Sequence, residues 1–358
     1  MSQFVDLSHV YHWAGREYLL HPISSGLLHT TWRVEVDNEP CAILQKINVQ
    51  VFKRPNDIVF NLELLNKYLQ ENNSTYSIML PMLTQSGDRN WWQDENTCWR
   101  AFPFIKDSIT IERVTSVEEA YNAAYAFGHF TAQFHSFDAT QLKVILPDFH
   151  NLSLRFKQFS DALQSGEGQR IQKFETILHD IQSYSWLMHY WGHEINNKLP
   201  VRVIHHDTKI SNVLFQRNAG APIVIDLDTI MPGNIVSDIG DMMRTYLSEE
   251  NETSCNWEAI LARASYYSNI IEGYKKAMKG ILTDAEINAM PMSGIILIWM
   301  QALRFGTDYL LGDLYYGATY PEQNFDRCKN QLYLLKSYIQ IQDVKIAFDS
   351  WKSKYVRQ

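Results

Sequence analysis

The sequence has few cysteines and none of the patterns in which cysteines act together. Its 358 residues hold only Cys41, Cys98, Cys255 and Cys328, scattered and with no CxxC pair. This spacing is typical of free thiols, and it argues against a disulfide framework or a cysteine-ligated zinc site. We therefore expect a protein of a reducing compartment, the cytoplasm.

Blocks of like charge are also missing. Charged residues make up 20% of the chain, the formal net charge is -8, and the pI is near 5.8. Proteins that bind nucleic acid or anionic membranes usually carry clusters of Lys and Arg. Neither partner is therefore expected.

No apolar run is long enough to span a bilayer. The most apolar stretch, SGIILIWMQAL at residues 293–303, has 11 residues, whereas a membrane-spanning helix needs about 20. It predicts a buried helix instead. The N-terminal stretch MSQFVDLSHVYHWAGREYLL lacks the basic segment and apolar core of a signal peptide.

The first hundred residues have the pattern of a small sheet with one helix. Residues 30–37 and 41–47 read as two strands of a hairpin, joined by the turn NEP. Residues 56–70 carry apolar side chains at helical spacing behind an Asn/Asp start. SIMLPML, residues 77–83, and TCWRAFPFI, residues 97–105, are predicted strands.

Helical patterns dominate after residue 107. One predicted helix opens with a capping box from Thr115 to Glu118, and a later one with a capping box from Thr283 to Glu286. Three short β-rich runs, PVRVIHHD, NVLFQ and PIVIDLD, interrupt the helices. We predict an α+β chain with a small β-rich lobe, residues 1–103, and a larger, mostly helical lobe, residues 104–358.

The stretch VIHHDTKISNVLF, residues 203–215, is where polar residues concentrate. By itself, a His and an Asp two residues apart more often form a hydrogen-bonded polar turn than a reactive site. However, NVLFQ and PIVID should pair as a hairpin, which would bring Asn212 close to Asp226. Carboxylate and amide oxygens of this kind suit Mg²⁺.

The spacing H-x-D-x-K-x-x-N within this stretch is the one that phosphoryl transfer uses. An aspartate beside the metal, such as Asp207, can orient a hydroxyl and accept its proton. A zinc site from His205, His206 and Asp207, as in a metal hydrolase, is an alternative. It is disfavoured because adjacent residues rarely bind one metal.

At this point the sequence resembles a known group. HHDTKISN followed by IDLD resembles the catalytic core of the aminoglycoside-phosphotransferase-like kinases, relatives of the protein kinases. Five segments, between residues 44 and 316, are together similar to the N-acetylhexosamine 1-kinases: LQKINVQVF, RAFPFI, HHDTKISNVLF, IDLDTIMPGNIVSDIGDMMR and LRFGTDYLLGDLYY. The resemblance implies a two-lobed protein-kinase-like fold with ATP as co-substrate and Mg²⁺ as cofactor. The implied reaction phosphorylates the anomeric 1-hydroxyl of N-acetylglucosamine or N-acetylgalactosamine.

The resemblance also implies roles for individual residues. Asp207 is the base, Lys209 reaches the γ-phosphate, and His205 braces the loop. Asn212 and Asp226 hold the metal. Two further carboxylates are assigned less directly: Asp228 would share the strand face of Asp226 and act beside the metal, and Asp238 would steady the catalytic loop.

The sugar site is assigned to Arg304 and Tyr315, an Arg that can donate hydrogen bonds and an aromatic ring that can cover a sugar face. Asp308, one turn after Arg304, is expected to orient it. A continuous helix would place Arg304 and Tyr315 on one face, and a bend near Gly312 is the alternative. His29 is assigned to the substrate as well.

The nucleotide site departs from the wider kinase pattern. SSGLLHTTW contains one glycine, Gly26, where a phosphate-covering loop has three. Gln45 stands where the phosphate-binding lysine is expected, and Lys46 should point to the opposite face of the strand. Gln45, Lys46 and Phe104 of the connector are all assigned to nucleotide binding.

Other functions are compatible with this pattern. The chain could be another small-molecule kinase of the same fold, acting on choline, an amino alcohol or an aminoglycoside, or a nucleotide-binding regulator without catalysis. A cationic substrate would require acidic surroundings, whereas the predicted pocket carries Arg304. The intact Asp207, Asn212 and Asp226 argue against an inactive regulator.

Overall fold

The computed structural model describes residues 7, 10–23, 29–87, 91–93, 97–217 and 220–356. The chain forms two compact units. We call the first the sheet unit; it comprises Met1–Glu112, Gln141–Leu146 and Leu214–Met231. The second is the helical unit; it comprises Arg113–Thr140, Pro147–Val213 and Pro232–Gln358. The division at residue 103 stays a prediction.

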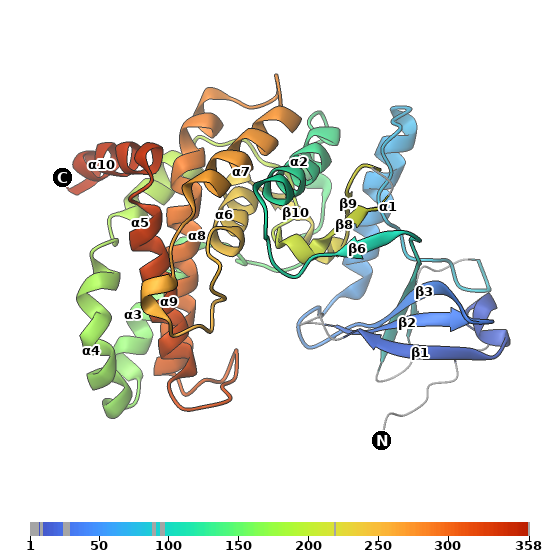
Figure 1. Cartoon of the computed structure of the whole chain (residues 1–358), viewed down its shortest axis with the longest axis horizontal. Coiled ribbons are helices and arrows are strands. Elements are labelled where there is room, and N and C mark those ends of the chain that lie inside the picture. Colours follow the sequence, from blue (N-terminus) through green and yellow to red (C-terminus); the bar gives the residue numbers. More distant parts are fainter. Residues whose placement is uncertain are drawn as a thin grey trace. The chain divides into compact units, whose positions relative to one another are not determined.

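An antiparallel sheet is the main element of the sheet unit (Figure 1). Asp37 and Asn38 both have positive φ angles, 53° and 64°, as a two-residue hairpin turn requires, and the predicted hairpin is confirmed. The predicted strand at residues 77–83 is wrong, because this apolar run belongs to no strand of the structure. In sheet order, the strands are β1 (Tyr18–Ile23), β2 (Thr30–Val36), β3 (Glu39–Lys46), β5 (Cys98–Pro103) and β4 (Trp92–Gln93).

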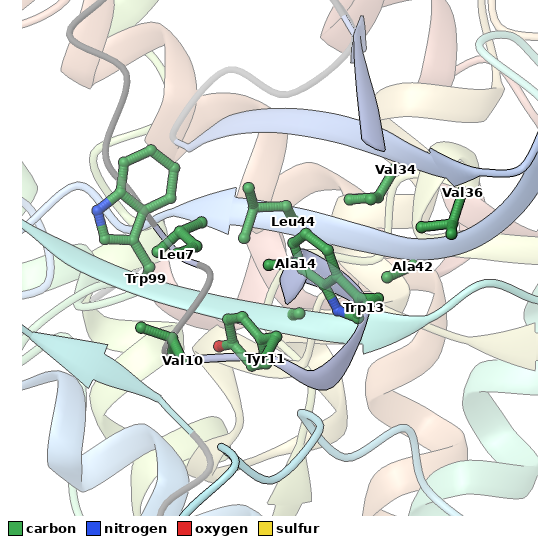
Figure 2. Packing of buried hydrophobic residues seen from close by; sticks show 11 residues of the cluster. Leu7, Val10, Tyr11, Trp13, Ala14, Val34, Val36, Ala42, Leu44 and Trp99 are labelled. Atoms are coloured by element: carbon green, nitrogen blue, oxygen red, sulfur yellow. The ribbon is translucent and has the colours of Figure 1, made fainter. Parts of the chain in front are cut away.

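One face of this sheet is covered by the segment that precedes it. Tyr11 and Trp13, the latter in the short helix η1 (His12–Gly15), pack in one buried cluster with Leu44 and Trp99 (Figure 2). Because side chains alternate along a strand, Lys46 shares the face of Leu44, and its ammonium lies 5.8 Å from the Trp99 ring. The opposite face of β3 therefore carries Gln45.

The remaining elements of the sheet unit include the segment with the sequence IDLD, which carries Asp226 and Asp228. Helix α1 (Pro55–Glu71) contacts the short helix η5 (Leu227–Thr229). Strand β8 (Val213–Gln216) lies between β6 (Ser108–Thr110) and β9 (Ile223–Val224). The predicted pairing of NVLFQ with PIVID is confirmed by the neighbouring positions of β8 and β9.

The helical unit is built around α8 (Asp284–Leu310), which packs against α6 (Ile235–Tyr246) and α9 (Gln323–Tyr338), as Figure 1 shows. The predicted buried helix at residues 293–303 lies within α8 and is confirmed.

Among the described residues, no helix combines the length and apolar character needed to cross a membrane. The other elements are α2 (Val117–Gln133), η2 (Ala139–Gln141), α3 (Leu152–Ser165), α4 (Gly168–Gln182), α5 (Leu187–Tyr190), η3 (Trp191–Asn196), β7 (Arg202–Ile204), η4 (Ile210–Asn212), β10 (Met231–Gly233), η6 (Trp257–Ala259), α7 (Ala264–Ala277) and α10 (Gln342–Val356).

The helix starts follow local capping chemistry. The predicted capping box from Thr283 to Glu286 is confirmed at the start of α8. At α2 the prediction is wrong by one residue, because Ser116 caps the helix and pairs with Glu119. The Glu119 carboxylate also accepts hydrogen bonds from Thr115, so Thr115 and Ser116 both bond to Glu119 at the start of α2.

Candidate active site

The predicted catalytic loop, residues 205–212, is organised by hydrogen bonds to Asp207. The Nζ atom of Lys209 lies 3.0 Å from Asp207 Oδ2. The Nδ2 atom of Asn212 donates to the same oxygen over 3.0 Å and to the Asp207 carbonyl over 2.8 Å. The predicted base, its lysine and its asparagine thus form one hydrogen-bonded group within the helical unit.

Asp207 is held in its ionised form by this group. Burial raises the pKa of the Asp207 carboxyl, but Lys209, His205 and the Asn212 hydrogen bond lower it by more, so that the net pKa lies below its ordinary value. A carboxylate that is ionised at neutral pH can accept a proton from a substrate hydroxyl.

Helix α6 holds the loop through two buried aspartates. Asp238 accepts hydrogen bonds from the backbone N–H groups of His205, over 3.2 Å, and His206, over 2.7 Å. Asp241 accepts the N–H of Thr208 over 2.9 Å. His206 has a φ angle of 68°, a strained conformation for a residue with a side chain, and the hydrogen bond to Asp238 stabilises it.

His205 is fully buried and braces the loop. Its ring makes edge contacts with Phe127 and Phe130, at centroid distances of 5.1 and 6.3 Å. Its Nδ1 atom accepts the N–H of Asp207 over 3.3 Å. Since its side chain is 0% exposed, the geometry favours a positioning role for His205.

A cavity of about 60 Å³ lies beside Asp207 and is lined by residues of the helical unit alone. Its lining contains both Asp207 and Arg304, which are far apart in the sequence and were predicted to serve base and sugar. Sequence reasoning missed the other polar residues of this lining. They are His150, His206, Asp241, Arg244 and Gln301.

The cavity has an excess of guanidinium and imidazole groups. Asp241 is paired with Arg244 over 2.8 Å, whereas Arg304 donates to the neutral Gln301 over 3.1 Å. Burial lowers the pKa of His150 well below its usual range, and the nearby His206 and Arg304 lower it further. The two arginines and two aspartates of the lining balance in formal charge, and Arg304, whose hydrogen-bond partner Gln301 is neutral, disfavours a cationic acceptor.

Aromatic rings surround the guanidinium of Arg304. Its central carbon lies 5.6 Å from the ring centre of Phe149, 5.9 Å from Tyr315 and 5.5 Å from Tyr316. Tyr315 is 73% exposed. A planar cation among rings, in the same cavity as the carboxylate of Asp207, is an arrangement that can receive a polyhydroxylated ring.

The loop that carries Tyr315 begins with a bend. Helix α8 ends at Leu310, and Gly312 has a φ angle of 89°, so the bend and not a continuous helix relates Tyr315 to Arg304. Asp308 was expected to orient Arg304. Its carboxylate instead accepts the backbone N–H groups of Tyr315, over 2.7 Å, and Tyr316, over 2.9 Å. Asp308 therefore shapes the loop.

The sheet unit contains a second polar cluster. One ligand atom from each of His29, Asp226 and Asp228 lies within 4.8 Å of the others, the spacing of a possible cation site. Asp228 forms a bidentate pair with Arg100, with distances of 2.5 and 2.7 Å. Burial raises the pKa of Asp228, but Arg100 and His29 lower it by more, so this carboxylate is ionised and already paired.

Both ring nitrogens of His29 are engaged. Its Nδ1 atom accepts the backbone N–H of Asn48 over 3.1 Å, so Nε2 carries the proton and donates to Asp228 over 2.8 Å. A metal would have to displace one of these bonds. The assignment of Asp226 as a metal ligand stays a prediction. Asp226 stands in the left-handed region with a φ angle of 56°, a strained conformation often found at functional sites.

The residues assigned to nucleotide binding lie on different parts of the sheet unit. Gln45 accepts a hydrogen bond from Arg100 Nε over 2.9 Å, while Lys46 lies on the opposite face beside Trp99. Phe104 donates its backbone N–H to Cys41 over 3.2 Å. Gly26 falls outside the described residues.

The predicted metal ligands, Asn212 of the helical unit and Asp226 of the sheet unit, both carry oxygen donors. Asn212 uses its amide nitrogen for Asp207, which leaves its amide oxygen outside those hydrogen bonds. Asp226 offers a carboxylate. Oxygen donors of this type, few in number, suit Mg²⁺ that retains water and substrate ligands.

The loop, the cavity and the aspartates that follow the β8–β9 hairpin are the parts of a kinase-type phosphotransferase. The structure is similar to solved structures along most of the chain. One is spectinomycin phosphotransferase APH(9)-Ia with ADP and spectinomycin, at 13% identity and a TM-score of 0.59, covering 96% of this chain and 95% of that one. Another is amicoumacin kinase hAmiN with AMP-PNP and Ca²⁺, at 14% identity and a TM-score of 0.57, covering 92% and 91%. A third is choline kinase from Cryptosporidium parvum Iowa II, at 14% identity and a TM-score of 0.53, covering 98% and 95%.

The chain belongs to the Phosphotransferase enzyme family, APH, whose family model matches residues 20–275. The predicted α+β, protein-kinase-like fold class is thereby confirmed, and so is the broader resemblance to aminoglycoside-phosphotransferase-like kinases. The protein is a phosphotransferase of this family.

Proposed function

We propose that the protein is an ATP-dependent N-acetylhexosamine 1-kinase, which phosphorylates the anomeric hydroxyl of N-acetylglucosamine or N-acetylgalactosamine. The observation that carries this proposal is the presence of Arg304 in the same cavity as Asp207. The guanidinium can donate hydrogen bonds to ring hydroxyls or to the N-acetyl carbonyl, and Tyr315 can cover a face of the sugar.

Asp207 and its neighbours have distinct roles in this reaction. Asp207 accepts the proton of the anomeric hydroxyl as that oxygen forms a bond to the γ-phosphorus and the bond from this phosphorus to the ADP oxygen breaks. Lys209 carries a positive charge next to Asp207, where it keeps the base ionised and can attract the γ-phosphate. Asp238 and Asp241 keep the loop in place.

Asn212 and Asp226 would hold Mg²⁺. When bound, this ion offsets the negative charge of the phosphates. Asp228 forms hydrogen bonds with Arg100 and His29, and in this proposal it has a supporting role beside Asp226.

Kinases of choline, amino alcohols and aminoglycosides are the main alternative, since such proteins share the fold. Their acceptors are cations. The lining of the cavity places its acidic groups in ion pairs, Asp207 with Lys209 and Asp241 with Arg244. The charge of Arg304 has a neutral hydrogen-bond partner in Gln301. A neutral sugar suits this environment better than an ammonium group.

A screen of ATP consumption tests the proposal. N-acetylglucosamine, N-acetylgalactosamine, glucose, galactose, choline and kanamycin are compared at equal concentration with Mg²⁺. Turnover with either N-acetylhexosamine, and loss of that sugar's reducing end, is the expected result. Turnover only with choline or kanamycin contradicts the sugar assignment. A folded wild-type protein that binds ATP and phosphorylates none of a broad acceptor set would instead be a regulator.

A further inference from the structure

His150 lines the cavity of the helical unit and is one of the polar residues that sequence reasoning missed. It directly precedes Asn151, the cap of α3, and its ring stacks on that of Phe149, with ring centres 4.5 Å apart. Arg155 donates to the backbone carbonyls of Asp148, over 3.0 Å, and Phe149, over 3.2 Å. The segment that carries His150 is therefore held in place from outside the cavity.

One of the two ring nitrogens of His150 is engaged with helix α6. Its Nδ1 atom is hydrogen-bonded to Ser237 Oγ, and the Nδ1 atom of His206 lies 2.7 Å from the same oxygen. The Nε2 atom of His150 makes no hydrogen bond to any described residue. It is thus the polar atom that His150 has left for a ligand in the cavity.

The shared hydroxyl determines which hydrogens the two rings carry. Ser237 has one hydroxyl hydrogen and can donate it to only one Nδ1 atom, so the other ring must donate its own Nδ1–H. Burial, and after it the charges of His206 and Arg304, lower the pKa of His150 well below its usual range, so this ring is neutral. The positive charge of Arg304 favours the tautomer of His150 whose Nε2 carries a lone pair. His150 therefore donates from Nδ1, and its Nε2 is a hydrogen-bond acceptor.

Few other acceptors of the cavity lining are available to a ligand. The carboxylates of Asp207 and Asp241 are in ion pairs. The side-chain oxygen of Gln301 accepts a hydrogen bond from Arg304 over 3.1 Å. A ligand hydroxyl that accepts a hydrogen bond from Arg304 still has a hydrogen to donate, and a buried donor left without a partner is unfavourable. The Nε2 atom of His150 can accept that hydrogen.

We propose that His150 is a substrate-binding residue that selects hydroxylated acceptors, by accepting at Nε2 the hydrogen of a hydroxyl other than the reacting one. Ser237 is a positioning residue that holds the ring. The proposal rests on the proposed function in taking this cavity as the acceptor site, but it does not depend on which sugar is bound.

Fluorinated acceptors test this contact. Steady-state kinetics are compared for the wild type and for His150→Phe, which keeps a planar ring beside Phe149. The acceptors are N-acetylhexosamines in which one hydroxyl at a time, other than the anomeric one, is replaced by fluorine, which has no hydrogen to donate. In the wild type, one of these analogues should lose about 10-fold or more in kcat/KM. In His150→Phe the parent sugar should lose a similar factor, and that analogue should lose no more than about 2-fold further. KM for ATP should stay at the wild-type value.

Two further variants separate this contact from a structural role. Ser237→Ala keeps the imidazole but removes its partner, so it should raise KM for the sugar by a smaller factor and leave KM for ATP unchanged. It decides the matter where His150→Phe does not fold, because an unchanged KM for the sugar then overturns the proposal. His179→Phe, at an exposed position of α4, is the matched control and should behave as the wild type. Equal losses with every fluorinated sugar in the wild type and in His150→Phe also overturn the proposal.

Failure of the proposed function gives a different result. If the wild type phosphorylates kanamycin and no N-acetylhexosamine, the sugar assignment fails, and His150→Phe is measured with kanamycin. A higher KM for kanamycin at unchanged KM for ATP then supports the contact, and an unchanged KM overturns it. Turnover of choline alone overturns both, because its single hydroxyl is the reacting one. Turnover of no acceptor overturns both as well.

Discussion

Asp207 can act as a base only while it is ionised and only if its carboxylate reaches the acceptor. We expect Asp207→Asn to lower kcat by about 10²-fold or more, because an amide cannot accept the proton of the attacking hydroxyl. The substituted side chain has the same size, and the bond from Asn212 to the backbone carbonyl of residue 207 is unaffected. ATP affinity, measured by calorimetry, should therefore stay near the wild-type value. Near-normal turnover in the folded variant would remove Asp207 from the mechanism.

We expect Lys209 to set the pH range in which Asp207 can act as a base. Burial raises the pKa of Asp207, and Lys209 is the leading cause of its net lowering. Replacing the lysine by methionine removes a cation, so the pKa of Asp207 should rise. The acidic limb of the pH profile of kcat should then move to higher pH. Lys209→Arg is the matched control, since it keeps the charge and should keep the limb in place. An unchanged limb in Lys209→Met would mean that Asp207 does not set it.

Asp238 gives a second pH effect, on stability. Burial raises the pKa of its carboxyl to about 7, against the opposing effect of two backbone N–H donors. In the unfolded chain the same group titrates near its ordinary value of about 3.9. Between these two pH values the folded state retains a proton that the unfolded state has lost, so Asp238 should reduce the free energy of unfolding as pH rises from about 4 to 7.

Urea denaturation of the wild type and of Asp238→Asn checks this sign. The free energy of unfolding of the wild type, relative to that of the variant, should fall across this pH range and level off above it. The variant cannot titrate at position 238. A difference that stays constant from pH 4 to 7 would show that the native carboxylate keeps its ordinary pKa.

At the scale of elements, the catalytic loop depends on the close approach of α6 and α8. A Cβ atom at Gly240 would lie 2.5 Å from the carbonyl oxygen of Ser293 and 2.7 Å from Leu297. Gly240 stands between Asp238 and Asp241, the two aspartates that bond to the loop. Gly240→Ala should therefore push α6 away from α8, lower Tm, and reduce kcat. Gly168→Ala is the control, because a Cβ atom at this position meets no atom within 4 Å, and it should leave Tm and kcat almost unchanged. Gly280→Ala is unsuitable as a control because the φ angle of Gly280 is positive. Equal behaviour of Gly240→Ala and Gly168→Ala would count against this packing argument.

The end of α8 and the loop after it form the predicted sugar site. Arg304 lies on the helix, and Asp308 holds the loop that carries Tyr315. Arg304→Ala and Tyr315→Ala should raise KM for the sugar far more than KM for ATP. The loss at Arg304 should be about 1–3 kcal/mol for a charged hydrogen bond left unmade. Steady-state titrations of both substrates measure the split, and Tyr333→Ala, an exposed residue of α9, is a control. A change in KM for ATP alone would move these residues to another site.

Most helices and strands could be predicted from local sequence patterns. Contacts between residues far apart in the sequence could not. Alternation and the turn at Asn38 gave the hairpin correctly, and Thr283 with Glu286 gave the start of α8. The apolar run at residues 77–83 looks like a strand, but strand formation needs a partner, which a single sequence does not reveal. The bend at Gly312 was an open alternative, because glycine allows a positive φ angle without requiring it.

The candidate site was predictable where its residues follow a fixed spacing. Asp207, Lys209 and Asn212 occupy one short loop, and their spacing, together with the five similar segments, predicted phosphoryl transfer. Arg100 had no such signal. Its contacts depend on the register of β5 with β3 and on Asp228, which lies 128 residues away. Only the strand register could have pointed to it, through its position opposite Gln45.

At the scale of the whole molecule, nucleotide and metal should act on stability together. The chain carries a net charge of -8, so ATP, a polyanion, is not attracted by the protein as a whole. We expect its binding to depend on local positive groups and on a cation for which Asn212 and Asp226 are the predicted ligands. Activity should therefore require Mg²⁺ or Mn²⁺ and vanish with EDTA.

A thermal shift measurement separates this requirement from catalysis. A ligand that binds only the folded state adds about 2.7 kcal/mol to the free energy of unfolding at 100 times its Kd. ATP with Mg²⁺ should therefore raise Tm by several degrees, while ATP with EDTA should raise it much less. Asp226→Ala should abolish most of the Mg²⁺-dependent part, because it removes the charged ligand. Asn212→Ala should remove a smaller share, because it deletes a neutral one. Equal shifts with Mg²⁺ and with EDTA in the wild type would mean that the nucleotide binds without the metal. The assignment of Asn212 and Asp226 would then have no support from binding.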